Sequence, residues 1–304
     1  MNEIFNPLTF NEALKIRGEK NALVFAGGTD LMVRYRAKNS MAPVIKGPVL
    51  FIDRIESLKK IDSAGGFLEI GAAVNLSVLA GDPGAEEADI PPLLKAAAGS
   101  IAAPALRNRA TLAGNVANAS PAGDGLCALV ALDAQVVLAS SGAERIITVY
   151  DFVTGPGKTE LKNNEIIRAF RITEPLPEKY YWRKVGTRKA NALTKVSLAA
   201  SLWFEYSDSE KTGIRKCILA FGAVGPRIVK IDVTEILNRN STELLSGNSL
   251  QEDLLNKVAA EIVSVSENRI TPIDDQRSTA EYRKKVALNL IRDFMLKTFG
   301  SNNK

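Results

Sequence analysis

Short apolar runs separated by polar turns dominate the first part of the chain. Three of these runs are too short for a helix and end at glycine, proline or polar clusters, which predicts strands. They cover residues 21–26 (NALVFA), 49–53 (VLFID) and 65–74 (GGFLEIGAAV). Ahead of them, NPLTFNEALKIRGE is predicted to be an amphipathic helix that Thr9 or Asn11 caps. The pattern therefore indicates a small α+β unit over residues 1 to about 60.

Longer patterns follow from residue 91 onward. PPLLKAAAGSIA at 91–102 is rich in alanine and leucine after a tolerated proline, which predicts a helix. CALVALDAQVVLAS at 127–140 predicts a short helix and then a strand. The segments 144–152 (ERIITVYDF) and 165–172 (EIIRAFRI) predict further strands of a second α+β unit. TEPLPEK at 173–179, with its two prolines, is the predicted linker.

The last third of the chain indicates a separate, smaller domain. KVSLAASLWFEYS at 195–207 and IRKCILAFGAVG at 214–225 predict an antiparallel pair joined by the polar turn 208–213. Two helices are expected after it. The final one carries a broad apolar stripe at a spacing of about four residues. The stripe contains Tyr282, Val286, Ala287, Leu290, Ile291, Phe294 and Met295.

Length and composition support two α+β domains and limit the class of protein. The chain has 304 residues, of which 46% are hydrophobic and 24% charged, as in globular proteins. No window reaches the length of apolar sequence that a membrane helix needs. The N-terminal MNEIFNPLTF lacks a basic leader and a long apolar core, so we expect a cytoplasmic protein.

Charge argues against nucleic acid as a partner. The net charge is +5, but lysine and arginine are spread along the chain and aromatic residues make up only 6%. A mild basic excess fits an anionic cofactor or an acidic partner surface equally well.

Missing residue types exclude several chemistries. The chain has no histidine, which removes Ser-His and Cys-His nucleophiles, His-ligated zinc and a flavin linked through histidine. Its two cysteines, Cys127 and Cys217, are too few for an iron–sulfur cluster or a four-cysteine zinc site. Both lie in apolar runs, so we expect buried, unreactive thiols and no metal site. A bound cofactor would then supply the chemistry.

Two glycine-bearing loops are the candidate cofactor site. VFAGGTDL at 24–31 offers the amides of Gly27 and Gly28 and the Thr29 hydroxyl, which suit a pyrophosphate. Its spacing is not the Gly-x-Gly-x-x-Gly fingerprint, and no helical crossover pattern of a parallel sheet surrounds it, so we predict no Rossmann fold. ATLAGNVANASPAGDGL at 110–126 adds several short polar side chains. Taken alone, the first segment could be a plain turn and the second a solvated loop.

Five motifs carry a resemblance to a known family. They are FAGGTDL (25–31), RNRATLAGNVANASPAGDGLCALVALDAQV (107–136), FVTGPGKTEL (152–161), RKVGTRKANALTKVSLA (183–199) and TPIDDQRSTAEYRKKVA (271–287). In order and spacing the chain resembles the FAD-binding medium subunit of molybdenum hydroxylases of the xanthine dehydrogenase type. The resemblance implies an α+β fold with a two-subdomain FAD-binding domain of the p-cresol methylhydroxylase and vanillyl-alcohol oxidase type. That domain would span residues 1–177, with subdomains of about 1–60 and 61–177. A CO dehydrogenase flavoprotein-like domain would span 178–304.

The resemblance also assigns FAD contacts residue by residue. The first loop would wrap the pyrophosphate, the second would hold phosphate, ribityl and flavin tail, Ile101 would approach the isoalloxazine, and Lys184 would lie near the flavin. Packing explains the apolar Ile101 and Ile167 equally well, a basic strand end explains Lys184, and a helix cap explains Asp124. The assigned residues are Val24, Phe25, Ala26, Gly27, Gly28, Thr29, Asp30, Leu31, Ile101, Thr111, Gly114, Asn115, Asn118, Ser120, Asp124, Ile167 and Lys184.

The family implies a role within a larger complex. A large partner subunit would hold molybdopterin, and a small one would hold [2Fe-2S] clusters. The resemblance also implies that the complex is a dimer of heterotrimers. Electrons would reach FAD here and pass to NAD⁺ or another acceptor, with no catalytic residue in this chain. Two departures are the absent four-cysteine insertion and the absent Ala-Pro-Thr-Pro-like run in AFGAVGPRIVK. The alternatives are a free-standing flavin oxidase or reductase and a flavin-free assembly subunit.

Overall fold

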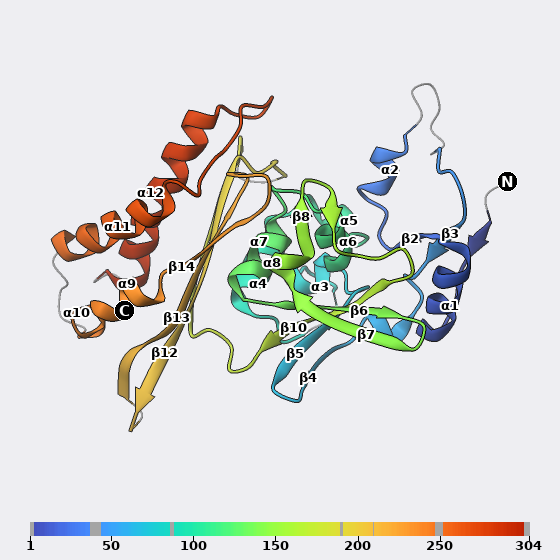
Figure 1. Ribbon diagram of the computed structural model, residues 1–304, viewed down its shortest axis with the longest axis horizontal. Helices are drawn as coiled ribbons and strands as arrows, with labels where there is room; N and C mark the ends of the chain where they lie inside the picture. The colour runs from blue at the N-terminus through green and yellow to red at the C-terminus, as the bar shows by residue number, and fades with distance from the viewer. Residues whose placement is uncertain are drawn as a thin grey trace. The chain divides into compact units, whose positions relative to one another are not determined.

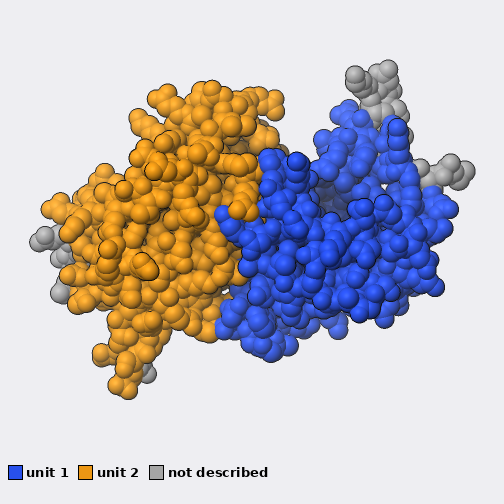
Figure 2. All heavy atoms as spheres, viewed as in Figure 1, with its two compact units in different colours: residues 1–90, 101–120, 134–174 blue, residues 91–100, 121–133, 175–304 orange. Residues whose placement is uncertain are grey.

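The computed structural model describes residues 3–36, 44–85, 88–188, 191–208, 210–246 and 252–300 (Figure 1). Residues 189 and 190 of the fourth motif and Ser209 of the predicted turn lie outside these ranges. The chain forms two compact units, coloured in Figure 2. Unit 1 comprises Met1–Ile90, Ile101–Ser120 and Ala134–Glu174. Unit 2 comprises Pro91–Ser100, Pro121–Asp133 and Pro175–Lys304.

A three-stranded parallel sheet opens unit 1. Its strands β1 (Ile4–Phe5), β2 (Leu23–Phe25) and β3 (Val49–Phe51) lie in the order β1-β3-β2. Helix α1 (Phe10–Lys20) connects β1 to β2, and the Thr9 hydroxyl accepts a hydrogen bond from the Glu12 amide, so Thr9 is the cap. The parallel pairing and the α1 crossover were not expected from the sequence, although β2 and β3 lie within predicted strands. Three strands of two or three residues are nevertheless not the large doubly wound sheet of a Rossmann fold.

The larger sheet of unit 1 has the order β4-β5-β10-β6-β7, with every neighbouring pair antiparallel. The short 3₁₀ helix η1 (Glu56–Leu58) precedes its first hairpin. The strands are β4 (Ile61–Ala64), β5 (Phe67–Gly71), β6 (Gln135–Ser140), β7 (Ala143–Thr148) and β10 (Ile166–Thr173). The predicted strand 144–152 ends early, because the Thr148 hydroxyl accepts from the Asp151 amide and caps helix α8 (Val149–Phe152).

Short elements complete unit 1 between these sheets. They are helices α2 (Leu31–Arg34), α3 (Leu76–Ala80), α5 (Pro104–Arg107) and α6 (Leu112–Ala117), and the hairpin of β8 (Val153–Gly155) and β9 (Lys158–Thr159). One buried cluster joins α1, β3 and the start of β10. It includes Ala13, Leu14, Leu50, Ile52 and Ile166.

Unit 2 is built on a four-stranded antiparallel sheet. Its strands β11 (Lys179–Val185), β12 (Val196–Ser207), β13 (Glu210–Gly222) and β14 (Val229–Asp232) lie in chain order. The predicted antiparallel pair is confirmed as β12 and β13. The turn between them is shorter than expected, since β13 already begins at Glu210.

Helices cover both faces of this sheet (Figure 1). Alternate residues of β12, including Leu198 and Leu202, join a buried cluster with the C-terminal helices. On the other face, Ser197 of β12 contacts Cys127 of helix α7 (Asp124–Ala131), which packs beside α4 (Pro92–Gly99). Two buried faces explain why β12 is apolar almost throughout. The C-terminal helices are α9 (Thr234–Arg239), α10 (Ser241–Leu245), α11 (Glu252–Ser266) and α12 (Ala280–Phe299).

The predicted stripe of α12 is confirmed except at its start. Leu290, Ile291 and Phe294 are buried, whereas Tyr282 is 44% exposed. The Lys195 ammonium lies 5.5 Å from the centre of the Tyr282 ring, so this side chain packs on the surface.

Both cysteines are fully buried, as expected. Burial raises the pKa of Cys127 to about 12 and also raises the pKa of Cys217. No helix within the described ranges is long and apolar enough to cross a membrane. Nor do the described His, Cys, Asp and Glu side chains form a group of three or more that could hold a metal ion.

Candidate functional site

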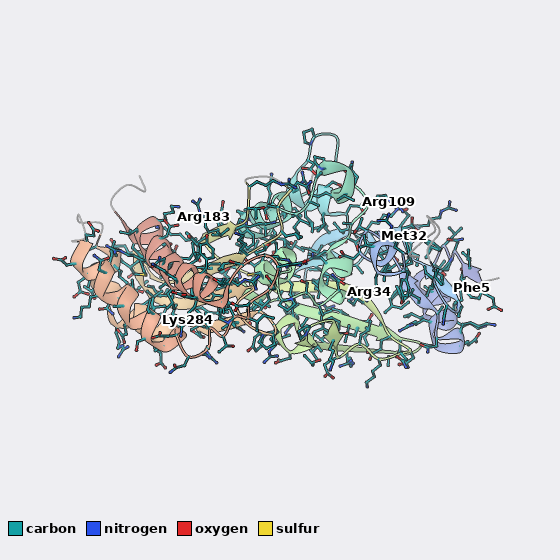
Figure 3. The ribbon with its side chains drawn as sticks, turned by 90° about the horizontal axis from the view of Figure 1, so that it is seen from above. Phe5, Met32, Arg34, Arg109, Arg183 and Lys284 are labelled. Carbon is teal, nitrogen blue, oxygen red and sulfur yellow. The ribbon has the colours of Figure 1, made fainter. Side chains whose placement is uncertain are left out.

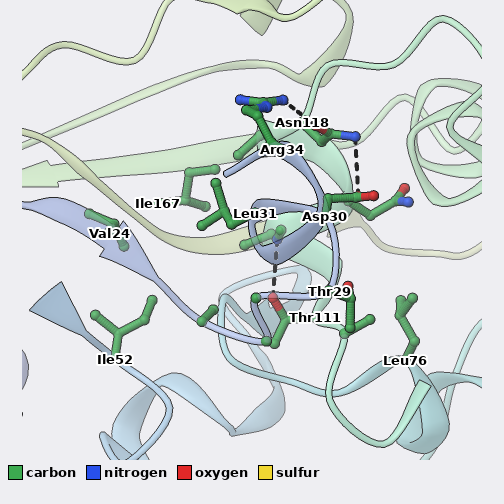
Figure 4. A pocket seen from close by; sticks show the side chains of 18 of the residues that line it. Val24, Thr29, Asp30, Leu31, Arg34, Ile52, Leu76, Thr111, Asn118 and Ile167 are labelled. Atoms are coloured by element: carbon green, nitrogen blue, oxygen red, sulfur yellow. Dashed lines mark hydrogen bonds between the residues drawn. The ribbon is translucent and has the colours of Figure 1, made fainter. Parts of the chain in front are cut away.

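A cavity of about 540 Å³ lies within unit 1 (Figure 4). Its size is that of a ligand pocket, for which about 300–1,000 Å³ is typical. Both glycine-bearing loops line it, so segments about eighty residues apart in sequence meet here. Of the residues that the resemblance assigns to FAD, those that line the cavity are Val24, Ala26, Gly27, Gly28, Thr29, Asp30, Leu31, Ile101, Thr111, Gly114, Asn115, Asn118 and Ile167.

The two glycines of the first loop are required by contacts with the chain itself. A Cβ on Gly27 would lie 1.9 Å from the Arg109 carbonyl oxygen, because the second loop approaches here. Gly28 has φ +74°, and a Cβ there would lie 2.2 Å from the Phe25 ring. Gly27 thus lets two backbone segments meet beside the cavity, and Gly28 leaves room for the Phe25 ring of its own loop.

The backbone amides of residues 27–30 in the first loop have no acceptor among the described residues. Free amide donors beside a cavity are stabilised by water or by a ligand acceptor. Consecutive free amides suit an anion such as a pyrophosphate, so this segment fits the group that the resemblance implies.

The second loop is held by Thr111 at the start of α6. The Thr111 hydroxyl accepts a hydrogen bond from the Gly114 amide at 3.1 Å, and Thr111 forms an isolated antiparallel bridge with Asn75. Thr111 is only 3% exposed. Its observed role is to cap the helix that presents Asn115 and Asn118 to the cavity.

One polar bridge spans the two loops at the cavity (Figure 4). The Arg34 guanidinium donates to the Asn118 side-chain oxygen at 2.6 Å, and the Asn118 amide donates to the Asp30 carboxylate at 3.1 Å. Asp30 and Asn118 were expected here from the sequence, whereas Arg34, which also lines the cavity, was not. The detectable signal was its position three residues beyond the loop, on the following helix.

A second arginine of the cavity was also missed. Arg17 of α1 donates to the backbone oxygens of Ala22 at 2.5 Å and Glu165 at 3.2 Å. Burial lowers the pKa of its guanidinium. Its place in α1, before the first loop, gave no sequence signal for a cavity residue.

The remaining wall of the cavity is largely apolar. Val24, Ile52 and Ile167 lie together beside the loops (Figure 4). A β-bulge between Ile167 and Ala169 interrupts the alternation of β10, and both Ile166 and Ile167 line the cavity. An apolar wall beside free amides suits a ligand with both a heterocycle and phosphates.

A buried ion pair supports the segment that carries Ile101. Arg107 binds both Asp82 carboxylate oxygens at 2.7 Å. It also donates to the backbone oxygens of Ile101 at 2.9 Å and Ala102 at 3.3 Å. Arg107 is only 7% exposed, so it positions the segment rather than facing a ligand.

Four assigned residues do not line this cavity. Phe25 is buried with its ring 4.7 Å from that of Phe51. Ser120 is the last residue of the segment Ile101–Ser120 of unit 1, and Asp124 and Lys184 belong to unit 2. Their assignment to FAD stays a prediction.

Within unit 2, Asp124 and Lys184 form a buried ion pair of 2.7 Å. Thr194 donates to Asp124 at 2.8 Å, and Lys184 also donates to the Ser100 carbonyl at 2.8 Å. Burial raises the pKa of Asp124, although Lys184 and Thr194 oppose the rise. Gly123 is the N-cap residue of α7, which begins at Asp124, and the Lys184 side chain is largely buried rather than an exposed strand end.

The chain matches known proteins over most of its length. Residues 1–175 match the family model described as the FAD binding domain in molybdopterin dehydrogenase, and residues 181–298 match the CO dehydrogenase flavoprotein C-terminal domain. The chain is 27% identical over 281 residues to the glyceraldehyde dehydrogenase medium chain of Sulfolobus acidocaldarius, covering 91% of both chains.

Two further similarities agree with this. The chain is 28% identical over 257 residues to a putative xanthine dehydrogenase FAD-binding subunit of Escherichia coli, covering 83% of this chain and 84% of the relative. In fold it is similar to a chain of quinoline 2-oxidoreductase from Pseudomonas putida, with a TM-score of 0.77 and 22% identity, over 98% of this chain and 96% of the other.

Proposed function

The chain belongs to the family of FAD-binding medium subunits of xanthine dehydrogenase-type molybdenum hydroxylases, and from this premise we propose that unit 1 binds FAD in its cavity. The observation that supports this most is the run of free amides at residues 27–30 beside a cavity with an apolar wall. The amides would bind the pyrophosphate, while Thr29 adds a hydroxyl. Val24, Ile52 and Ile167 would exclude water from one heterocycle.

The protein's part in the reaction is binding and positioning. Arg107 and Asp82 hold the Ile101 segment, which the family resemblance assigns to the isoalloxazine side. The chemistry supplied by bound FAD is the collection of two electrons and their transfer as a hydride to NAD⁺ or another acceptor. No side chain of this subunit needs to act as a nucleophile, and both thiols are buried.

The proposal includes partners and a location. Electrons would come from [2Fe-2S] clusters of a small subunit, after substrate oxidation at molybdopterin in a large subunit. The relatives include a dehydrogenase medium chain and an FAD-binding subunit, which supports a role within a complex. We infer that the complex is a cytoplasmic dimer of heterotrimers. We also propose that Asp124 and Lys184 contact the flavin and that Ser120 and Phe25 lie near it.

The first test is the visible absorption spectrum of the purified chain, before and after NADH without oxygen. We expect a flavin band, released as intact FAD on denaturation and bleached by NADH. A band that NADH does not bleach would exclude NADH as the electron donor in this direction while retaining FAD. No flavin after incubation with FAD would overturn the proposal in favour of the assembly subunit.

A second test addresses the partners. We expect the tagged chain, purified under mild conditions from its natural host, to carry molybdenum and iron in constant ratio to FAD. Full oxidase or reductase activity in the chain alone, with no bound metal, would instead favour the free-standing flavoenzyme.

A further inference from the structure

Few charged side chains line the cavity, and they differ in how many hydrogen-bond partners they have. Among its described lining residues the charged side chains are Arg17, Asp30 and Arg34. The Arg17 guanidinium is engaged by two backbone carbonyls. Asp30 and Arg34 lie at the same place, on either side of Asn118 (Figure 4).

Asp30 poses an electrostatic problem for the proposed ligand. It directly follows Gly28 and Thr29, whose amides would hold a pyrophosphate that carries negative charge. Like charges at short range repel, so a carboxylate here weakens binding unless a cation offsets it. The Asn118 amide binds the Asp30 carboxylate but carries no charge.

Arg34 is a cation beside Asp30 that still has hydrogen-bond donors without an acceptor among the described residues. It is exposed and makes no ion pair with any described carboxylate. One of its nitrogens donates to the neutral Asn118 oxygen, and no other described group accepts from the rest of the guanidinium. Its remaining donors are therefore available to an anion. Figure 3 shows Arg34 together with Met32 on α2, the helix that continues the first loop.

We propose that Arg34 is a pyrophosphate-binding residue of this chain, oriented by Asn118, whose positive charge offsets Asp30 and strengthens dinucleotide binding. The inference rests on the proposed binding of FAD. A guanidinium can bind Asn118 and a phosphate oxygen at the same time because its donors are arranged as a planar fork. Lysine at the same place would keep the charge but lose this shared geometry.

The test compares FAD affinity of flavin-free protein carrying Arg34→Ala, Arg34→Lys or Arg36→Ala. Arg36 is the matched control, since it is exposed on the same segment, has the same charge and does not line the cavity. We expect Arg34→Ala to weaken FAD binding about tenfold, the value of a charge-assisted hydrogen bond. The FAD affinity of Arg34→Lys should lie between those of Arg34→Ala and the unmodified chain. The affinity of Arg36→Ala should stay within about twofold of the unmodified chain.

Salt dependence separates a direct charge contact from a structural effect. FAD affinity of the unmodified chain should fall with ionic strength, and Arg34→Ala should show a weaker dependence than Arg36→Ala. Thermal unfolding of the flavin-free variants shows whether folding is intact. If the unmodified chain binds no FAD, the proposed function fails and this inference with it. If it binds FAD but Arg34→Ala matches Arg36→Ala in affinity and salt dependence, only the inference on Arg34 is overturned.

Discussion

At the scale of single residues, a glycine-rich loop can serve the ligand, the chain or both. Gly27 and Gly28 are explained by the approach of Arg109 and by the Phe25 ring, without any ligand. The amides of residues 27–30 nevertheless have no acceptor among the described residues and stay available to a ligand. The sequence indicated a loop for phosphate but not that Gly27 is needed for two segments to meet, nor that Gly28 is needed for the Phe25 ring.

This distinction predicts a loss of stability on Gly27→Ala even in the absence of FAD. The added Cβ would meet a backbone oxygen at 1.9 Å, so we expect a cost of roughly 3 kcal/mol in the free energy of unfolding. Gly18→Ala, in the last turn of α1, is the control, since nothing lies within 4 Å of a Cβ added there, and it should stabilise by about 0.5 kcal/mol. Urea unfolding of flavin-free protein measures both. Equal stability of Gly27→Ala and the unmodified chain would contradict the packing explanation.

The cysteines provide a second prediction at this scale. Because burial raises both thiol pKa values, Cys127 and Cys217 should resist a thiol reagent in the native state and react after unfolding. Their contribution to stability is complete below the ordinary thiol pKa of 9.0 and is lost as pH rises above it, since unfolded thiols then ionise first. Rapid labelling of the native chain at neutral pH would show that one of them is accessible.

At the scale of elements, sequence patterns predicted the longer helices and strands better than their junctions. The amphipathic α1, the β12–β13 pair and α12 follow from periodicity that extends over many residues. The boundary at Thr148 and the bulge in β10 depend on single hydrogen bonds and on neighbouring strands. The junction after α7 is similar, because Asp133 there has φ +52° and binds Lys216 of β13 and Lys230 of β14.

Asp133→Asn should destabilise unit 2 at neutral pH. Burial alone would raise the pKa of Asp133, but Lys216 and Lys230 hold it below its usual value. The resulting stabilisation is present above the ordinary pKa of 3.8 and is lost as pH falls through the lowered value. We expect a difference of about 1 kcal/mol between the variant and the unmodified chain, because the pair is partly exposed. Urea unfolding at decreasing pH should show this difference shrinking; a constant difference would refute the assignment.

At the scale of the whole molecule, the two compact units are not continuous stretches of the chain. Residues 91–100 and 121–133 precede the predicted boundary at residue 177 but cluster with unit 2. Every residue of α7 is buried, and the helix packs on β12 and β13. The domain boundary at residue 177 stays a prediction. The first family match ends at residue 175 and the second begins at residue 181.

A fragment of residues 178–304 should therefore fold poorly by itself. It lacks α4 and α7, so the face of the sheet that carries Ser197 would lose its cover. We expect dye binding to exposed apolar surface and no cooperative unfolding, with both reversed on coexpression of residues 1–177. A monomeric fragment that unfolds cooperatively would show that the two helices are dispensable.

The sequence by itself determined the α+β class, the principal elements, the two loops and the family, because these depend on local periodicity and on long ordered motifs. Only the tertiary structure decided which residues meet. Arg34 and Arg17 reach the cavity, Asp124 pairs with Lys184, and α7 joins the C-terminal sheet. Each of these contacts joins segments distant in sequence, and their energy comes from burial and charge pairing after the chain has folded, which no local pattern records.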